Sequence, residues 1–456
     1  MVYSLYAMRD ILFVTVDSLR ADHLDLYGYK RETAPFLRSL GETGNQLTNV
    51  FSHAGATRAS FPAILSSTYP MMYGGFKQIS EDRTLISEVL DDAGYNTGGF
   101  HSNPFLSADF GYDRGFDTLY DSQSNPSLIS RARDFAVKNI PRDTKIFKLL
   151  QTAFETTEKH AGVEMGSAYV RADELTNRAI KWLRNTDDSP TFLWAHYMDV
   201  HHPYLPPAEH QREISGEVID DRRAIQLRRK MLESPDEITD AELQTLIDLY
   251  DAEIRFTDEQ VARLVDSARA ELDDPVIIFT ADHGEEFREH GQFSHNTIHR
   301  EGVHVPLIVE DGSGPGTYED VVGLMDLSPT IASYAEQSVP EEFRGYNLRH
   351  LIDGKGWKRD AVIGNWGSVE DDKMWFFYRD TEWLYIRQNG EELYNVVKDP
   401  EETTNVLTEH SEVADEIRNK ITECESDIRG THRELDAITI DKDVNERLKM
   451  LGYKDE

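Results

Sequence analysis

Two aspartates and a histidine follow short apolar runs, in positions where they could bind a metal ion together. Asp17 directly follows the apolar run Ile11–Val16. Asp282 and His283 follow a second run, Pro275–Thr280, after one alanine. Such runs are typical of buried strands, and the carboxyl ends of parallel strands meet at one edge of a sheet. Two carboxylates and one imidazole suit a hard divalent cation, although a single aspartate after a strand is more often a helix cap.

A possible nucleophile lies in the stretch from Gly55 to Pro62, which leads into another apolar segment. This stretch carries two hydroxyl groups, on Thr57 and Ser60, near the start of a predicted helix. A hydroxyl at a helix N-terminus lies at the positive end of the helix dipole, and coordination to a divalent ion lowers its pKa. The alternative is that both side chains only cap the helix.

The elements that must position these residues indicate an α/β fold. A third apolar run, Thr191–Ala195, also reads as a buried strand. Between the strands lie helical patterns at Ala172–Leu183 and Asp251–Ala270, in which apolar residues recur at intervals of three and four. Strands that alternate with such helices predict a mostly parallel central sheet flanked by helices.

The pattern changes near Val362 to short aromatic strands, Met374–Tyr378 and Glu382–Arg387, followed by the helical segment Val413–Cys424. We therefore predict a catalytic domain over residues 1–360 and a small C-terminal α+β subdomain, with an antiparallel sheet, over residues 361–456. Two charged stretches without strand patterning, at about 122–166 and 209–242, are predicted insertions, with solvated helices as the alternative.

The composition excludes some classes of partner. Acidic side chains outnumber basic ones by 83 to 48, which gives a formal net charge of −35. Such a surface repels nucleic acid and anionic membranes. The sequence contains no run of about 18 apolar residues of the kind that would predict a membrane span. Its single cysteine can form no disulfide within the chain. We therefore expect a cytoplasmic protein. High acidity with few lysines predicts a halophilic protein, with an ordinary acidic protein as the alternative.

Motifs over nearly the whole chain resemble the sulfatase family within the alkaline phosphatase superfamily. They occur in the family's order, and each alone is moderately specific. The matching stretches are Val16–Leu24 with Tyr27–Tyr29, Gly115–Asp117, His196–Tyr204, Tyr250–Ile254, Thr280–Glu285, Gly302–Leu307, Glu392–Asn395 with Lys398–Glu401, and Glu446–Tyr453.

The resemblance implies an alkaline-phosphatase-like fold and an enzyme with one divalent metal ion, Mn²⁺, Ca²⁺ or Mg²⁺. It places the metal ligands at Asp17, Asp282 and His283, together with the oxygen of Thr57. The nucleophile of the family also falls on Thr57. Two histidines, His201 and His295, are the expected partners that donate the leaving-group proton or bind the oxygens of the transferred group.

The chain departs from sulfatases that carry cysteine or serine, oxidised to formylglycine, at the position of Thr57. The proline and arginine of that motif are Ala59 and Phe61 here, and the usual second metal aspartate is Ser18. Two clamping lysines are also replaced, one within the segment Phe100–Pro104 and the other by His295. Threonine cannot become an aldehyde, so an ester on Thr57 must be hydrolysed at its phosphorus or sulfur centre. In this respect the chain resembles lipoteichoic acid synthases and nucleotide pyrophosphatases of the superfamily.

We therefore predict a metal-dependent hydrolase of phosphoric or sulfuric esters, which cleaves phosphodiesters or transfers a phosphoryl group through a covalent intermediate on Thr57. The alternatives are a sulfuric ester hydrolase without formylglycine and a non-catalytic binding protein. The expected substrate is a small-molecule, glycan or lipid ester, and the oligomeric state is not predicted. Asp199 is expected to orient a histidine or to bind the metal itself. Structural roles are expected for five other polar residues: His202, His299, His304, Asp22 and His23.

Overall fold

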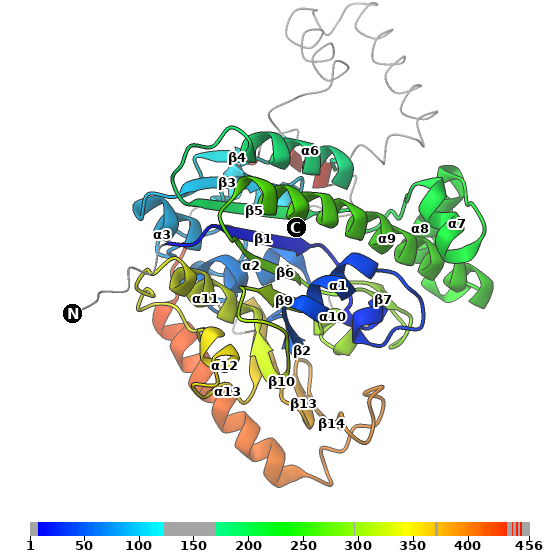
Figure 1. Ribbon diagram of the computed structural model, residues 1–456. Coiled ribbons are helices and arrows are strands. Elements are labelled where there is room, and N and C mark those ends of the chain that lie inside the picture. Colours follow the sequence, from blue (N-terminus) through cyan, green and yellow to red (C-terminus); the bar gives the residue numbers. More distant parts are fainter. Residues whose placement is uncertain are drawn as a thin grey trace, which may run out of the picture.

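Eight strands form the central sheet in the order β10-β2-β9-β6-β1-β5-β3-β4, shown in Figure 1. The computed structural model describes residues 8–122, 169–295, 297–369, 373–435, 440, 444–445 and 447–448. The sheet strands are β1 (Ile11–Val16), β2 (Asn45–Phe51), β3 (Asn96–Phe100), β4 (Thr118–Tyr120), β5 (Thr191–Tyr197), β6 (Val276–Ala281), β9 (Leu307–Glu310) and β10 (Gly316–Gly323).

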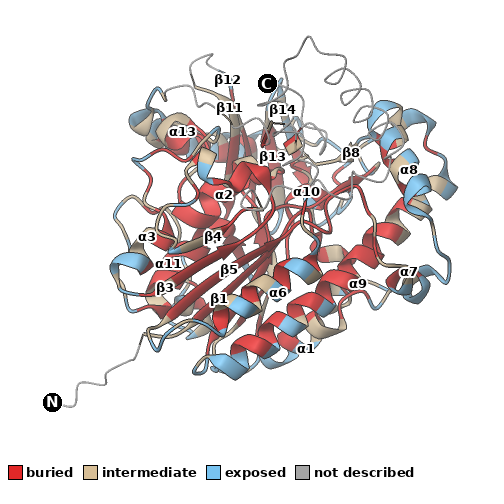
Figure 2. Cartoon of the chain, turned by 90° about the horizontal axis from the view of Figure 1, so that it is seen from above, coloured by how far each residue is buried: buried red, intermediate tan, exposed pale blue. Residues whose placement is uncertain are grey.

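The predicted mostly parallel sheet is confirmed. Strand β1 lies between β5 and β6 and is parallel to both, whereas β9 is antiparallel to its neighbours β6 and β2. Every residue of β1, β5 and β6 is buried, as expected for largely apolar strands that are covered by helices on both faces. Figure 2 shows these strands as a buried layer between helices with exposed outer surfaces.

Helices cover both faces of the sheet (Figure 1). On one face, α9 (Asp240–Glu271) packs against α1 (Pro35–Thr43) and α6 (Ala172–Leu183). On the other face, α2 (Thr57–Ser66), α3 (Ile86–Asp92) and α11 (Leu327–Tyr334) pack together. The apolar side chains from both layers form one continuous core with the sheet.

The helix predicted over Asp251–Ala270 is part of α9, which begins eleven residues earlier. Thr239 caps its N-terminus through a reciprocal pair of hydrogen bonds with Glu242, and this capping box fixes where the helix starts. The predicted insertion at 209–242 is helical, with α7 (Ala208–Ser215) and α8 (Asp221–Glu233) packed on α9. Residues 123–166 of the other predicted insertion lie outside the described residues.

The C-terminal strands form a separate antiparallel sheet, as expected. Its strands are β11 (Val362–Ser368), β12 (Lys373–Arg379), β13 (Trp383–Arg387) and β14 (Glu391–Asn395). One face packs on helix α13 (Ser411–Thr431), and the other packs on residues near the end of the central sheet, including Phe51. Among the residues with described placement, no helix is long and apolar enough to span a bilayer.

Candidate active site

The register of three strands brings two aspartates side by side at the carboxyl edge of the sheet. Val16, the last residue of β1, pairs with Ala281 of β6 and Tyr197 of β5. The next residues on β1 and β6 are Asp17 and Asp282, and both side chains are fully buried. The edge predicted to hold the site therefore does bring these carboxylates together.

A strained turn after β1 fixes the direction of both carboxylates. Ser18 adopts a left-handed backbone conformation with φ of 58°, which is uncommon for residues other than glycine. Its N–H donates to Asp282 Oδ1 at 3.2 Å, and its hydroxyl donates to Asp17 Oδ1 at 2.9 Å. The Tyr250 hydroxyl holds the turn by donating to the Ser18 carbonyl at 2.7 Å. Ser18, the residue at the family's second aspartate position, thus positions the two remaining carboxylates.

Thr57 is the first residue of α2, so its hydroxyl lies at the positive end of the helix dipole. The hydroxyl donates to Asp17 Oδ2 at 3.1 Å and lies 3.2 Å from His283 Nε2. Gly55, two residues earlier, permits a close approach of the backbone to Thr297, because a Cβ atom on Gly55 would lie 2.0 Å from the Thr297 carbonyl oxygen. The N-cap residue of α2 is Ala56, so the Thr57 side chain does not cap the helix.

The residues at this point fit a divalent cation. Asp17, Asp282 and His283 each direct one ligand atom into a group within 4.8 Å, and all three are buried. His283 Nδ1 donates to the Gly284 carbonyl at 2.8 Å, which places the lone pair of the neutral ring on Nε2. Among the described residues, Asp282 Oδ2 is buried without a hydrogen-bond partner. Oxygen ligands with an imidazole nitrogen form a donor set that hard divalent ions accept.

Burial and neighbouring groups shift the pKa values of the two carboxylates in opposite directions. Burial and the neighbouring charge of Asp17 raise the pKa of the Asp282 carboxyl well above its usual range. For Asp17, burial is outweighed by the nearby imidazoles of His196, His201 and His283, which hold its pKa well below the usual range. Two buried carboxylates this close repel each other, and a bound cation would remove that cost.

His201 and His295, the two histidines expected to act on the substrate, lie beside this centre. The His295 ring centroid is 5.1 Å from that of His201 and 5.3 Å from that of His283. The Nδ1–H of His201 donates to the His202 carbonyl at 2.6 Å, so the lone pair of the neutral ring lies on Nε2. Burial lowers the pKa of His201 to about 4 and that of His295 well below its usual value. Both imidazoles are therefore neutral near pH 7.

Two residues of the stretches in which the resemblance expects positive charges, Asn103 in the segment Phe100–Pro104 and Phe61, make other contacts here. Asn103 donates from Nδ2 to Asp17 Oδ2 at 3.0 Å, while its Oδ1 accepts the Phe105 N–H. Phe61 is fully buried and packs edge-on against the His196 ring, with centroids 5.1 Å apart. The sequence shows that the lysine and arginine are absent but does not indicate these new contacts.

The structural roles expected for other residues agree with their contacts. Both nitrogens of His202 are engaged, one by Arg228 Nε at 3.2 Å and the other by Ser294 Oγ at 3.0 Å. His304 donates to the Thr48 carbonyl at 2.8 Å. Further contacts within the fold join Asp22 to Arg20, His23 to Asp251, and His299 to Glu402. Asp199, expected behind a histidine or at the metal, instead accepts the Ala172 N–H at 2.9 Å, at the first turn of α6.

A cavity of about 670 Å³ reaches from His295 to the C-terminal sheet. Trp366 of β11 and the turn residues Gln388 and Asn389 line its far side. The cavity thus offers room beside the candidate site for the part of a substrate that leaves.

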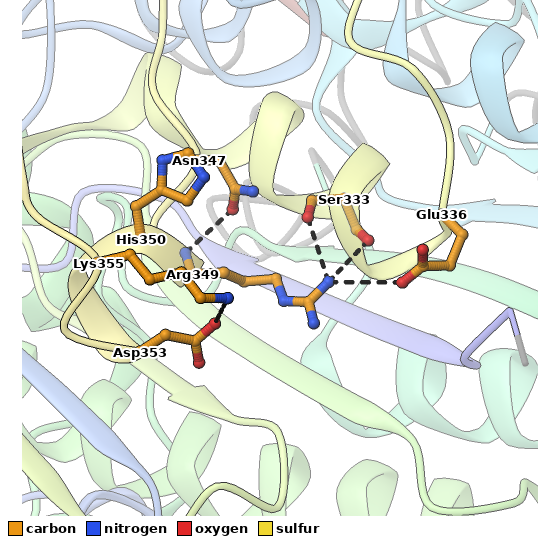
Figure 3. Close-up of a pocket in the computed structure, with 7 residues that line it drawn as sticks. All are labelled: Ser333, Glu336, Asn347, Arg349, His350, Asp353 and Lys355. Atoms are coloured by element: carbon orange, nitrogen blue, oxygen red, sulfur yellow. Dashed lines mark hydrogen bonds and ion pairs between the residues drawn. The ribbon is translucent and has the colours of Figure 1, made fainter. Parts of the chain in front are cut away.

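A second hollow, of about 280 Å³, lies beside α11 and α12 (Arg349–Ile352) and is shown in Figure 3. Its cations are already paired: Lys355 with Asp353 at 2.7 Å, and Arg349 with Glu336 and the Ser333 carbonyl. We therefore assign the chemistry to the edge that carries Thr57.

Known proteins resemble this chain in sequence and in fold. Residues 9–337 match the family described as Sulfatase, and residues 288–427 match the family described as N-sulphoglucosamine sulphohydrolase, C-terminal. An arylsulfatase of Clostridium perfringens is 23% identical over 456 aligned positions, which cover 90% of this chain and 92% of that protein.

Two solved structures share the fold. The phosphonate monoester hydrolase of Agrobacterium radiobacter has a TM-score of 0.68 and 19% identity, and the match covers 92% of this chain and 95% of that one. A protein in complex with its substrate, D-glucosamine-2-N,6-O-disulfate, also has a TM-score of 0.68, with 16% identity and coverage of 92% and 97%.

Proposed function

The chain belongs to the sulfatase family of hydrolases, and on this premise we propose that it cleaves phosphodiesters through a covalent ester on Thr57. One observation carries the proposal. The Thr57 hydroxyl lies at the N-terminus of α2, 3.1 Å from Asp17 Oδ2 and 3.2 Å from His283 Nε2. A hydroxyl in this position can act as a nucleophile without modification to an aldehyde.

In the first displacement, Thr57 Oγ1 forms a bond to phosphorus as the bond to the leaving alcohol breaks. The Thr57 proton moves to Asp17 Oδ2, its hydrogen-bond acceptor, while His201, neutral with its lone pair on Nε2, takes up a proton from solvent and passes it to the leaving alcohol. In the second displacement, water attacks the threonine ester, His201 accepts a water proton and returns it to solvent, and Thr57 regains its hydroxyl hydrogen from Asp17. The sum is ester plus water to acid plus alcohol.

The carboxylates and imidazole around Thr57 would hold the divalent cation on which the family generally depends. Asp17, Asp282, His283 and the Thr57 oxygen are the proposed ligands. The bound ion would supply positive charge that offsets negative charge on the transferred group. Its identity stays a prediction among Mn²⁺, Ca²⁺ and Mg²⁺.

The replaced clamp residues favour a substrate with a single negative charge. Phe61, the segment Phe100–Pro104 and neutral His295 occupy the positions at which the resemblance places cations. A phosphate monoester carries between one and two negative charges near pH 7, whereas a phosphodiester or a sulfate ester carries one. A site with fewer fixed positive charges therefore disfavours the monoester most.

A sulfuric ester is the second candidate substrate, because the arylsulfatase of Clostridium perfringens aligns over 90% of this chain. Its sulfate group carries the same single charge. The 670 Å³ cavity beside His295 would accept the alcohol of either ester, including a sugar.

A substrate panel tests the proposal and separates the two candidates. A bis-aryl phosphate, an aryl phosphonate monoester and an aryl sulfate are assayed in molar KCl with Mn²⁺, Mg²⁺, Ca²⁺ or Zn²⁺, because the composition predicts salt tolerance. We expect the diester to be hydrolysed fastest, and Thr57→Ala to lower kcat at least about 10³-fold. Thr57→Ser keeps a hydroxyl and is the matched control, for which turnover remains measurable.

Hydrolysis of the sulfate alone would reject the diester assignment and leave the second candidate. Unchanged turnover in Thr57→Ala would reject the nucleophile. If no ester is hydrolysed with any metal, the alternative of a non-catalytic binding protein stands.

A further inference from the structure

A row of three hydrogen-bonded, buried side chains leads to the Asp17 carboxylate at its Oδ2 atom. Thr15 of β1 is paired in register with His196 of β5, and the Trp194 ring lies two residues before it on the same strand. All three side chains and Asp17 are fully buried. The sequence resemblance assigns Thr15 and His196 no role, and both residues lie inside largely apolar strands.

The neighbours of this polar group favour one arrangement of hydrogens. The Trp194 Nε1–H can only donate, and it lies 3.0 Å from Thr15 Oγ1, which therefore accepts. Thr15 Oγ1 keeps one hydrogen and a second lone pair, so it could donate to or accept from His196 Nδ1, 3.0 Å away. The Asp17 carboxylate, 3.4 Å from His196 Nε2, can only accept, which favours the hydrogen on Nε2 and a Thr15 hydroxyl that donates to Nδ1.

The Nε2 atom of His196 lies beside the active site. It is 3.4 Å from Asp17 Oδ2, the same oxygen that accepts from Thr57, and it is buried without another hydrogen-bond partner among the described residues. Phe61 packs edge-on against the His196 ring at 5.1 Å between centroids, and the Trp194 ring lies 6.3 Å away. This packing restricts the orientation of the ring, and the Asp17 carboxylate favours the tautomer with hydrogen on Nε2.

We propose that His196 is a positioning residue, which the Trp194–Thr15 pair holds with its Nε2–H toward Asp17 so that this carboxylate faces Thr57 and the cation site. The inference rests on the proposed function for the roles of Asp17 and Thr57. Residues that orient a metal ligand from behind set its direction and basicity, and their loss typically weakens metal binding about 10- to 100-fold.

Two valine substitutions at matched positions test the inference. Thr15 pairs in register with Thr280 of β6, which is equally buried but donates to the Pro306 carbonyl instead of a histidine. Thr15→Val and Thr280→Val each remove one buried hydroxyl from neighbouring strands. We expect Thr15→Val to weaken Mn²⁺ binding about 10-fold in titration calorimetry of the full chain, and Thr280→Val to leave it within about twofold.

Substitutions of the histidine extend the test. His196→Phe keeps a ring but no N–H, and we expect it to weaken Mn²⁺ binding about 10- to 100-fold and to lower kcat more than it changes KM. His196→Gln keeps an amide N–H toward Asp17, and Thr15→Ser keeps the hydroxyl, so each should recover part of the loss. Thermal unfolding confirms that each variant is folded, and Thr15→Val carries the test if His196→Phe is not.

The inference is overturned if folded Thr15→Val and His196→Phe bind Mn²⁺ as wild type does, or if Thr280→Val weakens binding as much as Thr15→Val. These titrations need no turnover, so they support or overturn the role of His196 even when the substrate panel rejects Thr57 as nucleophile. A wild-type chain that binds no divalent ion overturns both.

Discussion

Among the described residues, three clusters have potential ligand atoms within 4.8 Å of one another. One consists of His201, His202 and His295, and the two that combine imidazoles with carboxylates differ in how their polar groups are paired. In the active-site cluster of Asp17, Asp282 and His283, Asp282 Oδ2 has no hydrogen-bond partner among the described residues. The lone pair on His283 Nε2 also faces this group, with the Thr57 hydroxyl 3.2 Å away and Asp282 Oδ2 3.6 Å away.

The second cluster, here called the junction cluster, consists of His290, His299 and Glu402. His290 pairs with Glu301 at 3.1 Å, and His299 pairs with Glu402 at 3.0 Å. The two rings stack with centroids 3.6 Å apart and 14° between their planes. Their nitrogen lone pairs therefore lie in two nearly parallel planes and cannot both be directed at one ion. Glu402 further binds Arg379 at 2.6 Å.

The comparison teaches that proximity alone does not make a metal site. Ligand atoms must also converge in direction and lack an arginine or carboxylate partner outside the cluster. Of the two clusters compared, the active-site cluster meets these conditions, whereas the junction cluster pairs with Glu301 and Arg379. In the junction cluster, Glu402 instead links His299, which follows β8 (Phe293–Ser294), to Arg379 of β12.

The largest expected contrast is in metal affinity. Asp282→Asn should weaken Mn²⁺ binding at least about 100-fold, because it removes a carboxylate from the active-site cluster. Glu402→Gln removes a carboxylate from the junction cluster and should leave affinity unchanged, with one ion bound per chain in equilibrium dialysis. Two ions per wild-type chain, one of them lost in Glu402→Gln, would make both clusters metal sites and break the comparison.

A smaller contrast is expected in stability. An ion that binds only the folded chain raises the free energy of unfolding by about 2.7 kcal/mol at a free concentration of 100 times Kd. We expect this increase in wild type and Glu402→Gln during denaturant unfolding in Mn²⁺, and its absence in Asp282→Asn at the same concentration. An equal increase in all three proteins would place the ion elsewhere.

The smallest effect concerns pH at the junction cluster. The hydrogen bond to Glu301 raises the pKa of His290 above its ordinary value of 6.5. A raised pKa means that the pair stabilises the fold fully below the unfolded pKa and loses this contribution as pH rises through the folded pKa. The free energy of unfolding of wild type should therefore exceed that of His290→Gln by at most about 1 kcal/mol near pH 5.5, and by less near pH 8.5. A difference that grows with pH would contradict the pairing, and Glu301→Gln should remove the pH dependence.

Much of the fold could be predicted from apolar runs and periodicity. The bounds expected for the strand at Ile11–Val16 and for the helix at Ala172–Leu183 agree with β1 and α6. The start of α9 was harder because its first turns are polar, although the Thr239–Glu242 capping box was readable as a signal. The 670 Å³ cavity depends on how two sheets meet, which no local pattern encodes.

The candidate site divides in the same way. Asp17, Asp282 and His283 could be placed together because each follows a buried strand, and Thr57 because it begins a helix. His196 and Thr15 could not, since their contact depends on the register of β1 against β5. A polar residue inside an apolar strand was the only available signal. Whether these residues act as assigned stays a prediction.

The stereochemical course of hydrolysis tests the central claim most directly. A phosphorothioate diester that is chiral at phosphorus is hydrolysed by wild type in isotopically labelled water, and the configuration of the product is determined. Two successive in-line displacements, first by Thr57 and then by water, predict net retention. Inversion would mean that water attacks the ester directly, and Thr57 would then not be the nucleophile.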